Sequence, residues 1–379
     1  MLEKKRLKSS QVMMENLGKL KSFLILKRIR SSRPFFNFFY FKFIQKEKSL
    51  LFRILSFLIS PFSLIYLGIV EIKRIVSKKF KLSCHVISVG NITMGGTGKT
   101  TVVKFLAERF LSLGKKVAII TSGIGGDRSF IYGKGEDLRK NKDVGDEVLL
   151  LSNNLPHVYI VKGKNKLKLV HFAEKEISPD IIIIDDGFHC YGIEKSLDIV
   201  VIDGTRKPGK LVLPSGILRE PFKNLKRADF FILNHANLME NNDIEKRLEK
   251  FKKKIFYMWY RIGEIKNLNG KRISPSEIKG KRVVAFAGIG NPFSFFSLIL
   301  KLKPEIVYGI PFPDHFKYKY RDYKEIKKIF FTTSSHFILT TEKDIYKLEN
   351  FQDIENLYFV KIEPVIDERM WEEISKIGL

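Results

Sequence analysis

The sequence predicts an α/β protein with a doubly wound, mostly parallel sheet, a second, smaller α/β domain and an N-terminal membrane-associated helix. Three observations support this fold class. Short apolar runs such as His85–Gly90 and Leu197–Asp203 alternate with helical stretches, as the buried strands of a parallel sheet do. A glycine-rich loop follows the first of these runs and leads into a helix over about 99–113. The apolar run Leu50–Val70 lies between basic flanks, which is typical of a helix at a membrane surface.

The charge of the chain indicates a polyanionic partner. Its 379 residues contain 68 Lys and Arg against 41 Asp and Glu, a formal net charge of +27. Residues 1–80 hold 18 of these basic residues and only four acidic ones, beside the most apolar segments of the chain. Basic and apolar residues in one region favour an anionic membrane surface over nucleic acid. We therefore expect no nucleic-acid partner. The two cysteines, Cys84 and Cys190, form no metal-ligand pattern.

The N-terminal apolar run leaves two membrane arrangements open. Leu50–Val70 is long enough to cross a bilayer, but Arg53 and Pro61 interrupt it. Both flanks are basic, and a single span would place one of them on the unfavoured side. A helix lying in the interface, or dipping into it with a kink at Pro61, keeps both flanks on one side and is the favoured interpretation. A buried core helix is the alternative without a membrane.

The strand and helix pattern then divides the chain. After the strand at His85–Gly90, further strands are expected at 116–121, 158–161, 180–184, 197–203 and 228–234, and a solvated helix within 241–254. A new strand-helix alternation starts at Lys281–Gly288 and continues with strands near 306–309 and 337–340. The predicted parts are a basic extension (1–48), the membrane-associated helix (49–80), the core domain (81–274) and the smaller α/β domain (275–379).

The loop after the first strand has the composition of a P-loop. Thr93–Thr100 reads TMGGTGKT, between a strand and a helix, as a P-loop NTPase-like fold requires. Its glycines allow backbone N–H groups to turn toward phosphate oxygens, and the helix N-terminus adds its positive dipole end. Lys99 can reach the β- and γ-phosphates of ATP, and the Thr100 hydroxyl can ligate Mg²⁺. The predicted nucleotide-binding residues are Gly95, Gly96, Thr97, Gly98, Lys99, Thr100 and Thr101.

A second Mg²⁺ partner is expected at the end of a nearby strand. Four isoleucines, Ile181–Ile184, run directly into Asp185 and Asp186. This is the Walker-B arrangement, in which a carboxylate binds the metal directly or through water. The alternative is a pair of aspartates that only cap the loop. Asp185, Asp186 and Thr100 are therefore the predicted metal residues.

Two further polar positions carry little information when each is considered alone. Asp146 and Glu147 precede an apolar run, so Asp146 reads as a helix N-cap. His315 lies in a proline-marked turn and reads as a surface histidine.

The order of motifs along the chain is more specific than any one of them. Over about residues 50 to 350 the motifs resemble those of the tetraacyldisaccharide 4'-kinase (lipid A 4'-kinase) family of Gram-negative envelope synthesis. That resemblance implies ATP-dependent phosphorylation of the 4'-hydroxyl of a tetraacylated, lipid-linked glucosamine disaccharide 1-phosphate at the cytoplasmic face of the inner membrane. The motifs are, in order, TxGGTGKT, VGDE, DDGF, LPSGILREP, AGIGNP, FPDH and TEKD.

The resemblance also implies roles for individual residues. Lys99 holds the triphosphate, and Asp186 corresponds to the Mg²⁺ carboxylate with Asp185 beside it. Asp146 and His315 match a pair that accepts the proton of the sugar hydroxyl, which is a poor nucleophile without a base. We expect a monomer. Supporting positions in the cleft are Glu147, His189, Arg219 and Glu220.

This chain departs from the family pattern at three places. Ser122 and Ile124 stand where the family usually has Arg and Tyr, and Arg128 is a candidate replacement for the guanidinium. His189-Cys190 replaces Gln-His, and Asn165-Lys166 replaces Asp-Arg. Because of these departures, a kinase for another lipid or sugar acceptor and a membrane-docked nucleotide-binding scaffold without catalysis remain the alternatives.

Overall fold

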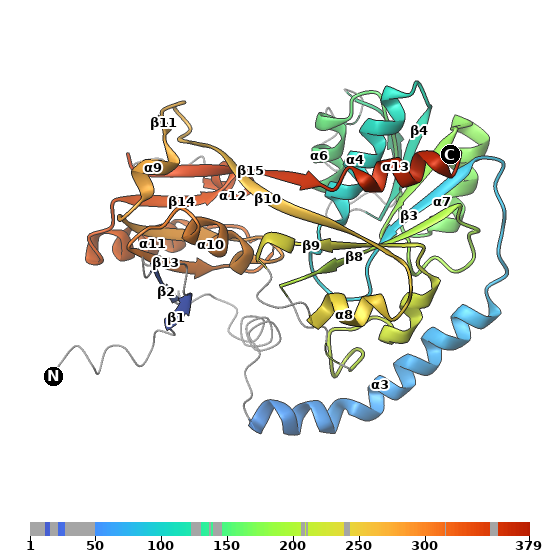
Figure 1. The fold of residues 1–379 in the computed structure, drawn as a ribbon, viewed down its shortest axis with the longest axis horizontal. Helices are drawn as coiled ribbons and strands as arrows, with labels where there is room; N and C mark the ends of the chain where they lie inside the picture. The colour runs from blue at the N-terminus through green and yellow to red at the C-terminus, as the bar shows by residue number, and fades with distance from the viewer. Residues whose placement is uncertain are drawn as a thin grey trace. The chain divides into compact units, whose positions relative to one another are not determined.

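The chain forms two compact units in the computed structural model (Figure 1). The core unit comprises Ser49–Met258 and Ile366–Leu379, and the second unit comprises Met1–Lys48 and Trp259–Val365. The structure describes residues 12–15, 22–26, 50–122, 130–135, 138, 146–205, 209, 211–238, 243–314, 316–348 and 355–379.

The sheet of the core unit is parallel except at one edge. Its strands follow the order β10-β9-β8-β3-β7-β4-β6-β5, and only β5 runs antiparallel to its neighbour β6. Every residue of β4, β7, β8 and β9 is buried, which explains why these strands read as continuous apolar runs. The bounds are β3 His85–Gly90, β4 Val117–Thr121, β5 Phe130–Gly133, β6 Tyr159–Gly163, β7 Ile181–Asp185, β8 Leu197–Asp203, β9 Phe230–Asn234 and β10 Lys254–Lys266.

Helices cover both faces of this sheet. Alternate residues of β7 point to opposite faces, so that Ile181 and Ile183 pack in one cluster with α4, α6 and α13. Ile182 and Ile184 pack in the other cluster with α7. These helices are α4 Lys99–Ser112, α6 Asp146–Asn154, α7 Lys166–Phe172 and α13 Arg369–Lys376; α8 Asp243–Glu249 packs beside β8 and β9.

The strand order brings the two predicted phosphate- and metal-binding loops together. β3 lies between β7 and β8, and Val89 near the end of β3 is in register with Asp185 at the end of β7. Because parallel strands end at the same edge of a sheet, the loops that follow β3 and β7 leave side by side. The predicted α/β class is confirmed.

The second unit has its own parallel strands. β2, β13, β12, β14 and β15 are neighbours in that order and run parallel, while β1 pairs antiparallel with β2 and β11 with the end of β10. The strands are β1 Val12–Glu15, β2 Ser22–Leu26, β11 Arg272–Ile273, β12 Arg282–Ala287, β13 Ile306–Pro311, β14 Phe337–Thr341 and β15 Leu357–Ile366. The helices are α9 Pro275–Ile278, α10 Pro292–Leu300, α11 Tyr320–Thr332 and α12 Glu342–Ile345.

The observed division differs from the predicted domain boundaries. The chain leaves the core unit between Met258 and Trp259, within β10, rather than near residue 275. A continuous strand has no linker composition, so the sequence carried no sign of this boundary. The last residues, Ile366–Leu379, return to the core unit. The basic N-terminal extension, predicted over residues 1–48, contributes β2, which pairs with β13.

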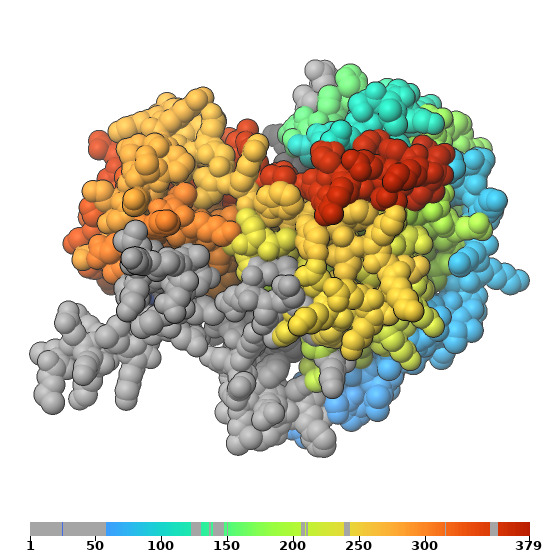
Figure 2. All heavy atoms as spheres, viewed as in Figure 1, coloured from blue at the N-terminus to red at the C-terminus, as the bar shows by residue number. Residues whose placement is uncertain are grey.

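The predicted N-terminal helix is α3, Leu50–Val76, with Pro61 inside it. Its polar side chains Ser63, Tyr66 and Glu71 hydrogen-bond to the rest of the core unit. Leu67 packs against the core unit, while eight other apolar side chains of the helix are exposed. The blue spheres of this helix lie on the surface of the core unit in Figure 2. Among the described residues, no helix combines the length and the apolar character that crossing a bilayer demands. The outward-facing side chains, 60% to 73% exposed, are Leu58, Phe62, Leu64, Ile65, Ile69, Ile72, Ile75 and Val76.

Candidate active site

The predicted P-loop connects β3 to the N-terminus of α4. Gly95 and Gly98 have φ angles of 95° and 91°, in the left-handed region that glycine enters without strain. The amide Nδ2 of Asn91 donates to Thr97 Oγ1 at 3.1 Å, and Asn234 Nδ2 donates to the Thr97 carbonyl at 2.8 Å. The two asparagines hold the loop in shape from β3 and β9. The first N–H groups of α4 have no partner within the helix and can bind an anion.

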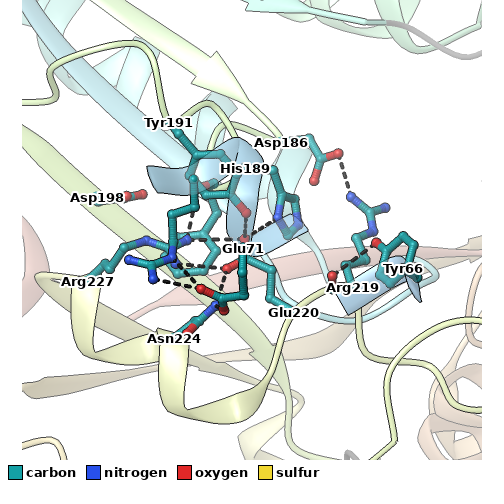
Figure 3. A network of polar contacts seen from close by, with 12 residues as sticks. Tyr66, Glu71, Asp186, His189, Tyr191, Asp198, Arg219, Glu220, Asn224 and Arg227 are labelled. Atoms are coloured by element: carbon teal, nitrogen blue, oxygen red, sulfur yellow. Dashed lines mark hydrogen bonds and ion pairs between the residues drawn. The ribbon is translucent and has the colours of Figure 1, made fainter. Parts of the chain in front are cut away.

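Asp186 binds both nearby cations of the site. Lys99 Nζ lies 3.4 Å from Asp186 Oδ1. Arg219 Nη1 lies 2.7 Å from Asp186 Oδ2 (Figure 3). Burial alone would raise the pKa of Asp186, but the charges of Lys99, Arg219 and Lys166 outweigh it and hold that pKa well below its usual value. The carboxylate is therefore ionised at neutral pH and is suited to Mg²⁺. Asp185, 6% exposed at the end of β7, and Thr100 in the first turn of α4 complete the predicted metal residues.

Lys166 is a site residue that the sequence analysis did not assign. Its Nζ donates to the backbone carbonyls of Asp185 at 2.6 Å and Asp186 at 2.8 Å. It follows β6 at the same edge of the sheet as the P-loop. This position after a strand was the one sequence feature that could have indicated a site residue. Asn165, the other residue of this departure from the family pattern, caps α7 by accepting from Lys168 N at 3.2 Å.

The segment Val212–Asn224, here called the Arg219 segment, lies against the P-loop. Met94 N donates to the Ile217 carbonyl at 2.8 Å, and Arg219 N donates to the Ile92 carbonyl at 2.7 Å. These backbone contacts place the Arg219 side chain beside Asp186. The predicted supporting residue Arg219 is thus in direct contact with the predicted metal carboxylate.

The fully buried Glu220 side chain points away from Asp186 into a cluster of partly buried polar side chains (Figure 3). Its Oε1 lies 2.5 Å from His189 Nδ1 and accepts from the Tyr191 hydroxyl at 2.6 Å. Its Oε2 accepts from Arg227 at 2.8 Å and from Asn224 Nδ2 at 3.0 Å. Burial opposes ionisation, but the hydrogen bonds of His189 and Arg227 outweigh it and lower the pKa of Glu220 well below the usual value.

Because of this cluster, we expect the free energy of unfolding to fall at acidic pH. The pKa of Glu220 is lower in the folded than in the unfolded chain, so its ionisation stabilises the fold above the ordinary value of 4.5 and that contribution falls as the pH drops. Glu220→Gln should lower the free energy of unfolding at pH 7 by about 3 kcal/mol, because it leaves Arg227 without its buried partner. It should also flatten the loss of stability as the pH falls below about 5. Urea unfolding at several pH values measures both effects, and an unchanged pH slope would contradict the role given to Glu220.

The departure at His189-Cys190 takes a defined form in the structure. Burial raises the pKa of the Cys190 thiol, so Cys190 is neutral at neutral pH and cannot replace a charged histidine. His189 instead contacts Glu220 through Nδ1. Ser122 is exposed just after β4, while Ile124 and Arg128 lie outside the described residues.

The predicted catalytic pair is only partly described. Asp146 and Glu147 are the first residues of α6, and the structure does not describe their side chains. His315 lies outside the described residues. The pairing of Asp146 with His315 therefore stays a prediction.

Three of the sequence motifs meet within the second unit. Phe312 N of the FPDH turn donates to the Ala287 carbonyl at 2.8 Å, at the end of β12. Gly288 N donates to Asp344 Oδ2 at 2.9 Å, and the Thr341 hydroxyl donates to the same oxygen at 2.8 Å. The buried Asp344 thus joins the AGIGNP and TEKD motifs.

Comparison with known proteins agrees with this geometry. The tetraacyldisaccharide-1-P 4'-kinase family model matches residues 55–378. A tetraacyldisaccharide 4'-kinase of Halothermothrix orenii is 31% identical over 343 residues, covering 82% of this chain and 89% of that protein. One of Francisella tularensis subsp. novicida is 35% identical over 304 residues, covering 79% and 91%.

A solved structure gives the same result. A crystal structure of "apo" form LpxK from Aquifex aeolicus in complex with ATP superimposes with a TM-score of 0.60 at 28% identity, covering 85% of this chain and 99% of that one. A P-loop beside paired aspartates is shared by many nucleotide-binding proteins, but a family match over this length is not. The chain therefore belongs to the tetraacyldisaccharide-1-P 4'-kinase family.

Proposed function

We propose that this protein is an ATP-dependent kinase that phosphorylates the 4'-hydroxyl of a tetraacylated glucosamine disaccharide 1-phosphate in lipid A biosynthesis. The observation that carries the proposal is the cluster of Lys99, Asp186 and Arg219 at the P-loop. Two cations and an ionised carboxylate beside this loop support the binding of a triphosphate there. Membership of the family supports the acceptor.

The two cations are suited to stabilise the phosphoryl group during transfer. In the structure Lys99 and Arg219 are both paired with Asp186. A triphosphate in the P-loop would compete with that carboxylate for them and draw both toward the transferred group. Phosphoryl transfer depends mainly on positioning and on such charge stabilisation.

A magnesium ion would be held by Asp186, with Asp185 and the Thr100 hydroxyl as further partners, and would neutralise charge on the β- and γ-phosphates. Lys166 binds the backbone carbonyls of both aspartates, so it fixes the direction of their side chains. Asn91 and Asn234 keep the loop open for the phosphates through Thr97.

Asp146 and His315 are the proposed acceptors of the proton from the sugar hydroxyl. Asp146 begins a helix, and a positioned carboxylate there can accept the proton as the hydroxyl attacks in line. Glu147 follows it and is proposed to support the same cleft. These roles rest on the motif order in the sequence.

The outward face of α3 supports action at a membrane. Eight exposed apolar side chains on one helix form a surface that water does not favour and that a bilayer would bury. Lys73 and Arg74 in its last turn, and Lys78 and Lys79 just after it, suit anionic headgroups. We propose a monomer bound to the cytoplasmic face of the inner membrane.

The direct test is a phosphotransfer assay with detergent-solubilised protein, γ-labelled ATP, Mg²⁺ and the tetraacylated disaccharide 1-phosphate. Wild-type protein should move the label into the lipid. Asp146→Ala should lower kcat by about a hundredfold, because the hydroxyl loses its base, while the affinity for ATP stays unchanged. Equilibrium binding of ATP provides the second measurement.

Two results would contradict parts of this proposal. No transfer by folded, ATP-binding wild-type protein would remove this acceptor and favour another lipid or sugar, or a nucleotide-binding scaffold. A fully active Asp146→Ala variant would remove Asp146 from the reaction and leave the kinase assignment standing.

A further inference from the structure

The side of α3 that faces the core unit carries three hydrogen-bonding side chains, beside the half-buried Leu67 that packs against the cluster of β8 and β9. Ser63, 6% exposed, donates from its hydroxyl to Ser215 Oγ at 2.8 Å and accepts from Ser215 N at 3.1 Å. Tyr66 and Glu71 follow on the same side, about one and two turns further along. All three side chains contact the Arg219 segment. Hydrogen bonds as well as apolar packing therefore join α3 to this segment of the core unit.

Tyr66 reaches the residue that contacts the metal carboxylate. Its hydroxyl donates to the backbone carbonyl of Arg219 at 3.0 Å. The N–H of the same residue donates to the Ile92 carbonyl in the P-loop at 2.7 Å. The peptide groups on either side of the Arg219 Cα are therefore held from two directions, by α3 and by the P-loop. Burial raises the pKa of the Tyr66 phenol, which keeps it a neutral hydrogen-bond donor.

Glu71 provides a second connection through a shared amide. Asn224 Nδ2 donates to Glu71 Oε1 at 3.1 Å and to Glu220 Oε2 at 3.0 Å. Arg74 pairs with the other oxygen of Glu71 at 2.7 Å. Glu220 follows Arg219 directly, so α3 contacts Arg219 through Tyr66 and is linked to Glu220 through Asn224 (Figure 3).

We propose that Tyr66 is a positioning residue for phosphoryl transfer: from α3 it holds the Arg219 backbone so that the guanidinium stays in reach of Asp186 and the transferred phosphoryl group. Ser63 and Glu71 anchor the two ends of the same segment. The inference rests on the proposed kinase activity. It makes α3, the proposed membrane helix, part of the catalytic architecture as well as an attachment.

The test uses the full chain in vesicles of phosphatidylethanolamine and phosphatidylglycerol that contain the acceptor lipid. Tyr66→Phe removes only the hydroxyl and should lower kcat by about threefold to tenfold, the value of one lost hydrogen bond. The KM for MgATP should stay nearly constant. Vesicle co-sedimentation should be unchanged, because the outward face of α3 is intact. Tyr257→Phe is the matched control: it removes a phenol that contacts Glu245 in the same unit and should leave kcat unchanged.

A double-mutant cycle separates positioning from general destabilisation. In an Arg219→Ala background there is no guanidinium to position, so adding Tyr66→Phe should no longer change kcat. The same factor in both backgrounds, or an unchanged kcat for the single variant, would overturn the proposal.

Hydrogen exchange tests the contact between Tyr66 and Arg219 without using the acceptor lipid. Amides of the Arg219 segment should exchange faster in Tyr66→Phe than in wild type. If wild-type protein transferred no phosphate, the kinase assignment would be wrong. Hydrogen exchange would then still test whether Tyr66 holds the Arg219 backbone. Unchanged exchange would show that Tyr66 does not hold the segment.

Discussion

Replacing Lys99 by Ala is expected to lower kcat for phosphoryl transfer by about 10³-fold. Lys99 is the first residue of α4 and its ammonium lies 3.4 Å from Asp186, at the mouth of the P-loop. Its charge is worth most in the transition state, where negative charge spreads over the transferred group. Single-turnover transfer of labelled phosphate to the lipid acceptor measures the chemical step directly.

The control for this variant lies on the same helix. Lys104→Ala also removes a lysine from α4, but its Nζ donates to Asn154 Oδ1 at 2.8 Å and lies near Glu108, away from the P-loop. It should keep wild-type kcat. A Lys99→Ala variant within tenfold of wild type would exclude Lys99 as a phosphate ligand during transfer.

Asp186→Asn is expected to have an effect of similar size, about 10³-fold on kcat, through the metal. The amide keeps the shape of the side chain but loses the charge that is proposed to bind Mg²⁺. It also releases Lys99 and Arg219 from their shared carboxylate. The apparent affinity for Mg²⁺ should therefore fall, while ATP without metal should bind at least as well as it does to wild type. Mg²⁺ titrations of activity measure the apparent affinity for the metal, and calorimetry measures the affinity for ATP without metal.

Asp180→Asn tests the same chemical change at the other end of the strand. Asp180 comes directly before β7, and its carboxylate accepts from Lys116 N at 2.7 Å. This variant should retain Mg²⁺ dependence and kcat. If Asp186→Asn left the Mg²⁺ titration unchanged, Asp185 would be the metal carboxylate instead.

Most of the core sheet could be predicted because its strands are buried on both faces. The predicted strands at His85–Gly90 and Leu197–Asp203 match the observed bounds, and the others differ by one or two residues at their ends. The P-loop lysine and the Walker-B pair are local in sequence, since each directly continues a strand. Their proximity follows from the parallel order of β3 and β7.

Other parts of the site depend on contacts between distant segments. Lys166 binds the backbone of Asp185 and Asp186 from another strand end, and backbone acceptors leave no mark in the sequence. The role of the inward-facing polar residues of α3 could not be predicted because the run is apolar on average. Their contacts form only with the distant Arg219 segment. The long strand β10 has partly exposed positions throughout, so it did not read as a buried run.

The interrupted sequence of the core unit also sets an order for its assembly on the ribosome. Met370 and Ile374 of α13 are buried in the same cluster as Val102 and Leu106 of α4, and Trp371 packs edge-on against Phe110 with ring centroids 5.1 Å apart. These residues belong to the final stretch of the chain, which is translated only after Trp259–Val365. At about 5 to 20 residues per second, the nascent core waits roughly 5 to 20 s for them. During that interval the cluster around α4 lacks α13, and the exposed apolar side chains of α3 are already outside the ribosome. The proposed contact of α3 with a bilayer would cover those side chains early and so protect the nascent chain from aggregation.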